Sequence, residues 1–208
     1  MIDRIKKYLI DGEGESLDYK QEISSASKIA KTMVSFANLK GGVLLVGVRD
    51  NRSIAGIRSE DEKYMLELAA SFYCKPEINL ELEEHNIGGK IILECTVPEG
   101  EFKPYSAKGE DGKWWVHIRN KDKSLLASKI VVDVLKRQAS NKGTLIKYGK
   151  NEEALLRYLE DNERITLQQF RKMVNISKWG ASKIIVNLIT AGVIINHTYE
   201  KPEFYTLV

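Results

Sequence analysis

The chain has 208 residues, which is enough for one large domain or two of modest size. Its 43% hydrophobic and 29% charged residues are typical of a globular protein and exclude a disordered one. The formal charge of +3 is unevenly spread, with a net of −4 over residues 1–100, +7 over 101–150 and zero over 151–208.

Signals for export or membrane insertion are missing from the sequence. No apolar run approaches the ~20 residues that a membrane span needs. The first ten residues carry four charges and no apolar segment of the kind that marks a signal peptide. Cys74 and Cys95 are too few for a disulfide framework. We therefore expect a cytoplasmic protein without a membrane partner.

The first two thirds of the chain mix helical and strand patterns. In chain order the periodicity predicts a short helix over 2–10, a strand over 17–20, a helix from Ser25 to Leu39, a buried strand over 43–48, a helix from a Ser59–Glu62 capping box to about Cys74, hairpins over 78–97 and 103–119, and a helix over 125–138. Gly41 and Gly42 are expected to stop the second helix, and Gly47 to allow a close approach. These elements predict an α/β domain over 1–140, a mixed α+β sheet with flanking helices.

The periodicity breaks between about 139 and 150, where we place a domain boundary. Residues 150–208 then predict a helix over 152–161, a short strand over 165–167, a helix over 167–174, a helix over 178–191 capped by Ser177, and a hairpin of strands over 193–196 and 204–207. This is the element order of a small C-terminal winged helix-turn-helix domain.

The charge of this predicted domain favours a polyanion as partner. Residues 171–198 contain basic side chains and no acidic one. The second helix of such a motif presents its early residues to the major groove. The candidate nucleic-acid contacts are Lys178, Trp179, Ser182, Lys183, Arg171, Lys172 and Lys201. Trp179 could instead pack in the core or at a protein interface, since winged helices also serve as protein-binding modules.

A motif in the larger domain resembles a known family. Residues 35–48 read Ser-Phe-Ala-Asn-Leu-Lys-Gly-Gly-Val-Leu-Leu-Val-Gly-Val, with acidic residues ahead of Lys20 and Trp-Val-His-Ile-Arg-Asn over 115–120. This pattern resembles the Schlafen/AlbA-type DNA-binding domain, also described as a divergent AAA or ATP-binding family, over about residues 10–138. It adds Arg119 to the candidate nucleic-acid contacts. No P-loop spacing accompanies the glycines, so the residues do not support ATP binding.

The resemblance also implies a second candidate function. Some Schlafen proteins cleave RNA with a divalent metal, and the resemblance places their acidic triad at Glu13, Asp18 and Asp50, with Lys20 beside it. Such carboxylates can hold Mg²⁺ or Mn²⁺ that activates water, while a lysine stabilises developing charge. Asp18 stands where the family usually has Glu. The vertebrate zinc site has no counterpart, because the cysteines and histidines lack ligand spacing.

Three functions therefore remain from the sequence. The first is a nucleic-acid-binding protein without a cofactor, a DNA-binding transcriptional regulator that takes double-stranded DNA and pairs as a homo-oligomer, most simply a dimer. The alternative is a Mg²⁺- or Mn²⁺-dependent nuclease, and the third is a non-catalytic assembly scaffold.

The sequence also offers candidate surfaces for pairing of two chains. Trp114 and Trp115 point to opposite faces of their strand, so one of them is a candidate for the pairing surface, as is the helix over 125–138.

Overall fold

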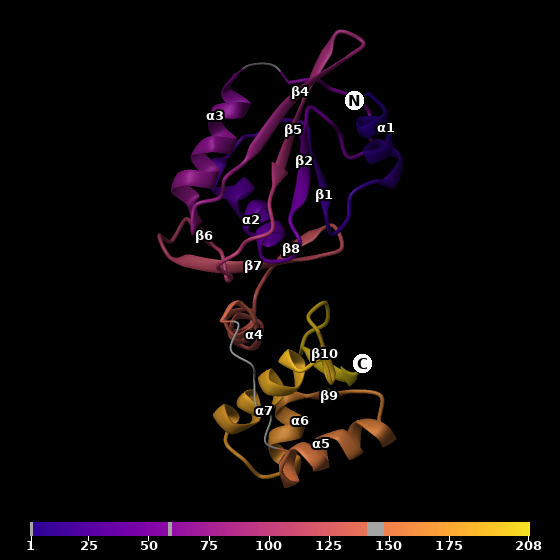
Figure 1. Cartoon of the computed structure of the whole chain (residues 1–208), viewed down its shortest axis with the longest axis vertical. Coiled ribbons are helices and arrows are strands. Elements are labelled where there is room, and N and C mark those ends of the chain that lie inside the picture. Colours follow the sequence, from indigo (N-terminus) through magenta and orange to yellow (C-terminus); the bar gives the residue numbers. More distant parts are fainter. Residues whose placement is uncertain (1, 58–59, 141–147) are drawn as a thin grey trace. The chain divides into compact units, whose positions relative to one another are not determined.

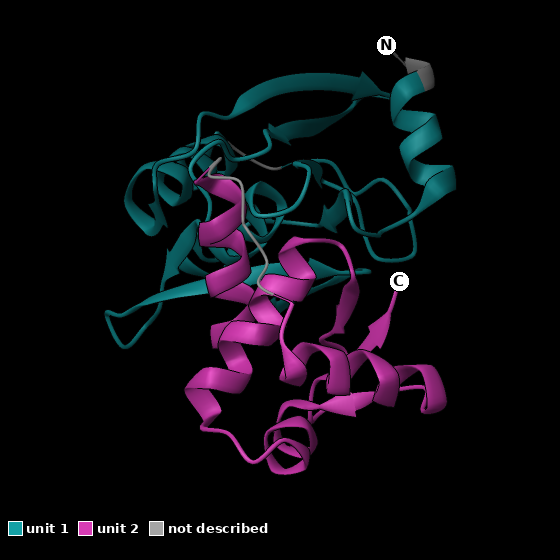
Figure 2. Ribbon diagram, turned by 60° about the horizontal axis from the view of Figure 1, so that its bottom comes forward, with its two compact units in different colours: residues 1–127 teal, residues 128–208 magenta. Residues whose placement is uncertain are grey.

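The computed structural model describes residues 2–57, 60–140 and 148–208. The chain divides into two compact units, residues 1–127 and 128–208 (Figure 2). The predicted cap Ser59 lies outside the described residues, as does much of the predicted boundary region. No helix in the described ranges is both long and apolar enough to cross a membrane.

The first unit consists of two sheets with helices packed on them (Figure 1). In chain order its elements are α1 (Ile2–Asp11), β1 (Leu17–Lys20), α2 (Ala26–Ala37), β2 (Gly42–Val46), α3 (Asp61–Leu68), the π-helix η1 (Ala69–Tyr73), β3 (Cys74–Lys75), β4 (Glu81–Ile87), β5 (Lys90–Val97), β6 (Ser106–Lys108), β7 (Trp114–Asn120) and β8 (Lys123–Leu126). One sheet has the order β1-β2-β5-β4, with β1 parallel to β2 and the other pairs antiparallel. The other is antiparallel, with the order β3-β6-β7-β8. The mixed sheet with flanking helices confirms the predicted fold class.

The alternation of side chains along the strands builds a core on each face of the mixed sheet. Leu44 and Val46 of β2 belong to the core around α2. Leu45, between them, belongs to the core that contains Ile5 of α1. Since successive side chains of a strand point to opposite faces, α2 covers one face of the sheet and α1 the other.

Two glycines lie where a side chain would collide with backbone. Gly41 has φ +77° and donates its N–H to the Phe36 carbonyl at the end of α2, at 2.9 Å. A Cβ on Gly41 would lie 2.7 Å from the Val97 carbonyl oxygen. Gly47 has φ +94°, and a Cβ there would lie 3.0 Å from the backbone of Gly56. The predicted helix stop and close approach are both confirmed.

The described part of the second unit, residues 128–140 and 148–208, contains four helices and a small sheet. Its elements are α4 (Lys129–Ala139), α5 (Lys150–Asp161), β9 (Ile165–Thr166), α6 (Leu167–Met173), α7 (Lys178–Thr190), β10 (Ile194–His197) and β11 (Phe204–Leu207). The strands pair antiparallel in the order β10-β11-β9. From α5 onward the elements follow each other in the predicted order, and Gly192 has φ +70° just after α7.

The helix α4 begins later than predicted, at Lys129, and it belongs to the second unit and not to the first. Leu125 and Leu126 extend β8, which pairs with β7, and the Ser128 side chain then caps α4 by accepting the Val131 N–H. Ile130 and Val134 of α4 are buried in one core with residues of α7. The chain therefore divides between residues 127 and 128, ahead of the predicted boundary, because the apolar face of α4 is buried against α7.

Candidate nucleic-acid interface

The start of α7 is set by its local sequence. Asn175 has φ +49°, in the left-handed region that asparagine tolerates better than most residues, and turns the chain between α6 and α7. Ser177 then caps α7 by accepting the Gly180 N–H at 3.1 Å. This cap places Lys178 and Trp179 in the first turn of a helix that has no acidic residue there.

The same end of α7 presents its large side chains to solvent. Lys178 and Lys183 are exposed, and Ser182 is partly exposed. Trp179 is 71% exposed, and Lys183 Nζ lies 5.2 Å from the centroid of its ring. Such exposure excludes a core role for Trp179 and leaves the indole free to contact a partner.

The other predicted contacts of this unit are also at the surface. Arg171 and Lys172 are exposed in the last turn of α6. Lys201 is exposed between β10 and β11. The flanking His197 is held in place, since its ring stacks on Phe204 with centroids 4.6 Å apart. The exposed cations thus come from α6, α7 and the hairpin connection.

Arg119 does not belong to this set. Its side chain is 1% exposed. The guanidinium donates to the carbonyls of Gly14 and Leu17 at 2.9 and 3.2 Å and to Asp18 Oδ1 at 2.8 Å. A guanidinium with these partners and no solvent access cannot bind a phosphate, so the predicted nucleic-acid contact at Arg119 is wrong.

Asp18, a member of the predicted acidic triad, is occupied by the protein's own cations. It is buried, with Oδ1 bound to Arg119 and Oδ2 lying 2.5 Å from Lys20 Nζ. Among the described residues, no hydrogen bond is directed at Oδ2, and the Lys20 ammonium donates to the Tyr19 carbonyl at 2.7 Å. The contact between Asp18 and Lys20 is therefore an ion pair without a directed hydrogen bond.

The triad as a whole does not form a metal-binding group. Glu13 Oε1 accepts the backbone N–H of Tyr19 at 2.8 Å, and Asp50 is exposed in the turn after β2. In the described ranges, the one group of three or more potential ligands whose atoms all lie within 4.8 Å of one another is elsewhere. Glu13, Asp18 and Asp50 therefore do not fit a divalent ion in this arrangement.

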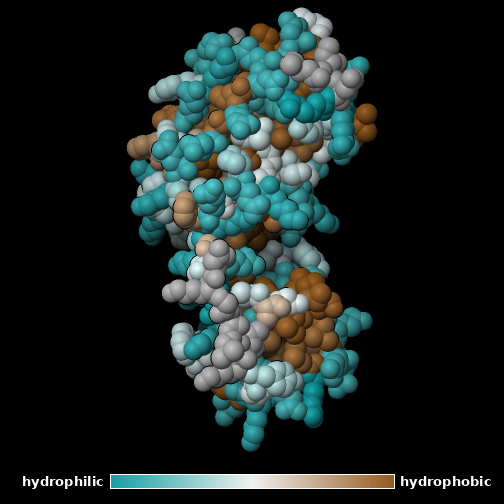
Figure 3. Space-filling model, in the orientation of Figure 1, coloured by the Kyte–Doolittle hydropathy of each residue, from teal (hydrophilic) through white to brown (hydrophobic). Residues whose placement is uncertain are grey.

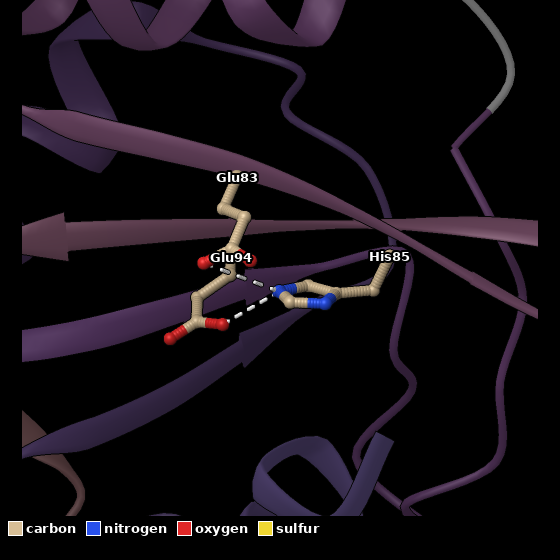
Figure 4. A group of neighbouring side chains, drawn as sticks. All are labelled: Glu83, His85 and Glu94. Carbon is tan, nitrogen blue, oxygen red and sulfur yellow. Dashed lines mark hydrogen bonds and ion pairs between the residues drawn. The ribbon is translucent and has the colours of Figure 1, made fainter. Parts of the chain in front are cut away.

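That other group, Glu83, His85 and Glu94, is one that the sequence did not single out. Figure 4 shows the three side chains gathered on neighbouring strands, β4 and β5. Glu94 is 2% exposed, and its Oε2 lies 2.7 Å from His85 Nε2. Arg4 of α1 binds both carboxylates, at 2.7 Å from Glu94. Because one guanidinium on α1 binds a carboxylate on each of two strands, the group ties α1 to the sheet. The sequence signal that could have revealed this group is Glu94, a charged residue inside the apolar run of β5.

Asn38 shows why the family-like motif has an amide at this position. The side chain is 4% exposed at the end of α2. Its Nδ2 donates to the carbonyls of Tyr105 and His117, each at 2.8 Å, and its Oδ1 accepts the Tyr105 N–H at 2.7 Å. One side chain thus joins α2 to β7 and to the segment before β6.

The first unit is therefore an α/β domain in which polar residues of the motif serve the fold. A family model described as "Schlafen, AlbA_2" matches residues 13–127, more than half of the chain, and the chain belongs to this family. Membership associates the protein with nucleic-acid binding. The sequence matches no curated protein significantly.

Two solved structures are similar over part of their length. The DIP2311 protein from Corynebacterium diphtheriae is 16% identical, with a TM-score of 0.49 over 85% of this chain. This chain spans only 39% of that protein. The N-terminal domain of an "ATP-dependent DNA Helicase RecG-related Protein" from Nitrosomonas europaea is 23% identical, with a TM-score of 0.39, over 61% of this chain and 94% of that domain.

Proposed function

We propose that the protein is a DNA-binding transcriptional regulator whose second unit is a winged helix-turn-helix. Three features support this assignment: the order of elements from α5 to β11, the pairing of β9 with β11, and the tight turn between α6 and α7. In this assignment α7 is the recognition helix and the connection between β10 and β11 is the wing.

The observation that carries the proposal is the exposed, acid-free start of α7. Lys178 and Lys183 can bind phosphate oxygens or the edge of a guanine, and Ser182 can donate to or accept from several bases. Trp179 adds an exposed ring for contact with a sugar or a methyl group. Arg171 and Lys172 of α6 and Lys201 of the wing would supply phosphate contacts on either side.

A double charge reversal tests the proposal. Lys178→Glu with Lys183→Glu should weaken binding to a labelled duplex strongly and leave the melting temperature nearly unchanged, because both side chains are exposed. Log affinity decreases as log salt increases, and this dependence should become less steep by about one for every phosphate that is no longer bound. Lys150→Glu, at the start of α5, is a control that makes half of this charge change away from α7. Unchanged affinity and slope in the double variant would remove α7 from the interface.

We also propose that the regulator acts as a homodimer, since one winged helix contacts a short site and two half-sites are read by a two-fold pair. Trp114 and Trp115 are each 40% exposed, which leaves apolar area for a partner. Figure 3 shows a second apolar surface (brown) on one side of the second unit. Light scattering decides this point: a mass near 23.6 kDa without DNA, together with one protein copy per bound duplex, would contradict pairing.

A further inference from the structure

The helix α4 forms a second wall beside the proposed recognition helix. Ile130 and Val134 are 5% and 8% exposed in the core that they share with α7. Near the other end of α4, Arg137 Nη1 donates a hydrogen bond to Asn187 Oδ1 of α7. The helix is thus attached to α7 by apolar packing and by a polar contact, and Figure 2 draws it with the second unit.

A hollow of about 740 Å³ lies between the two helices. Most of the side chains that define its chemistry are cationic or aromatic: Lys129, Lys136 and Arg137 from α4, and Lys178, Trp179 and Lys183 from α7. Asp133 is the one acidic side chain among the described residues that line it, and it pairs with Lys129 at 3.0 Å.

Two of the lysines that line the hollow are available to bind a ligand. Among the described side chains, neither Lys136 nor Lys178 has a hydrogen-bond or ion-pair partner, and both are exposed. Like charges gathered on two facing helices repel one another unless an anion lies between them. An anionic ligand with several charges in a row could form ion pairs with these cations on both helices.

We propose that the hollow binds the sugar-phosphate backbone of one strand of a DNA duplex. This inference rests on the proposed function and adds α4 to the interface. The major groove, roughly 12 Å wide, admits one helix, so α4 cannot enter it beside α7. With α7 in the groove, a helix packed along its side lies over the bordering phosphates. Lysine ammonium groups bind phosphates as point charges and carry no sequence preference.

Neutral variants of α4 test the inference. Lys129→Gln with Lys136→Gln should weaken binding to a labelled mixed-sequence duplex by roughly tenfold, the effect of removing one to two charge-assisted hydrogen bonds. The decrease of log affinity with log salt should become less steep by about two. Asp133→Asn should raise the affinity for the duplex, because it removes a carboxylate that repels phosphates and releases Lys129 from its ion pair. Lys150→Gln on α5, which makes the same kind of charge change outside the hollow, should leave both quantities as they are.

The outcomes separate this inference from the proposed function. If the α4 variants bind as the unchanged protein does while the α7 double reversal abolishes binding, α4 is not part of the interface and the proposed recognition helix stands. If Lys150→Gln weakens binding as much as the α4 variants do, only net charge matters and α4 is again excluded. If the unchanged protein binds no duplex at low salt, both proposals are wrong.

Discussion

Arg119 Nη2 of β7 lies 2.8 Å from Asp18 Oδ1 of β1, joining the antiparallel sheet to the mixed sheet through a buried ion pair. The guanidinium carbon also lies 4.9 Å from the centroid of the Phe36 ring on α2. Two residues that the sequence suggested for nucleic-acid and metal binding therefore satisfy each other inside the protein.

Removing either partner should destabilise the first unit strongly. Arg119→Ala leaves the Asp18 carboxylate buried with only Lys20 nearby, and breaking a buried pair in this way costs about 3–5 kcal/mol. Urea denaturation measures the decrease in unfolding free energy. Arg49→Ala is the control, since Arg49 is exposed and binds only Ser53 among the described residues, and a change within about 0.5 kcal/mol is expected. Equal stability of Arg119→Ala and the control would contradict the structural role.

Asn38 should be nearly as sensitive. Asn38→Ala leaves the Tyr105 N–H and two carbonyls without their partner, which should lower the unfolding free energy by roughly 3 kcal/mol. Asn38→Asp is informative beside it. The carboxylate can still accept the Tyr105 N–H but faces both carbonyls with an oxygen, so it should not rescue stability at neutral pH. A stable Asp variant would show that the donor bonds of Asn38 matter little.

The two cysteines should be unreactive in the native protein. Burial raises the pKa of the Cys74 and Cys95 thiols from 9.0 to about 12, because the charged thiolate loses its hydration. At pH 8 iodoacetamide should therefore modify them only after unfolding in urea. The same shift makes stability fall as the pH rises from about 9 toward 12, since the unfolded chain then binds fewer protons than the folded one. Rapid alkylation of the folded protein would show that the thiols are accessible.

No metal-dependent strand cleavage is expected. Asp18 is paired with Arg119 and Lys20, and it does not gather with Glu13 and Asp50 into a group that could hold one ion. Incubation with single-stranded RNA, structured RNA and DNA in the presence of Mn²⁺ tests this expectation. Cleavage that disappears in Asp50→Ala would show that the acidic residues act as the family resemblance implied.

Local sequence determined most elements of this protein because their signals are local. The apolar run at 43–48 predicted the buried strand of the mixed sheet. Ser25 and Ser177 predicted two helix starts, and Gly41 predicted a helix end, because capping and positive φ depend on a few neighbouring residues. The order of elements from α5 to β11 followed from the same signals.

The tertiary structure alone decided which groups meet. Periodicity shows that one face of α4 is apolar, but not whether the first unit or α7 covers that face. Charge patterns likewise place Arg119 and Asp18 in the sequence without showing that each neutralises the other, a contact between residues 101 positions apart. Burial and pairing depend on contacts between distant segments, so the use of a charged side chain, inside the fold or on a partner, is decided only when the chain has folded.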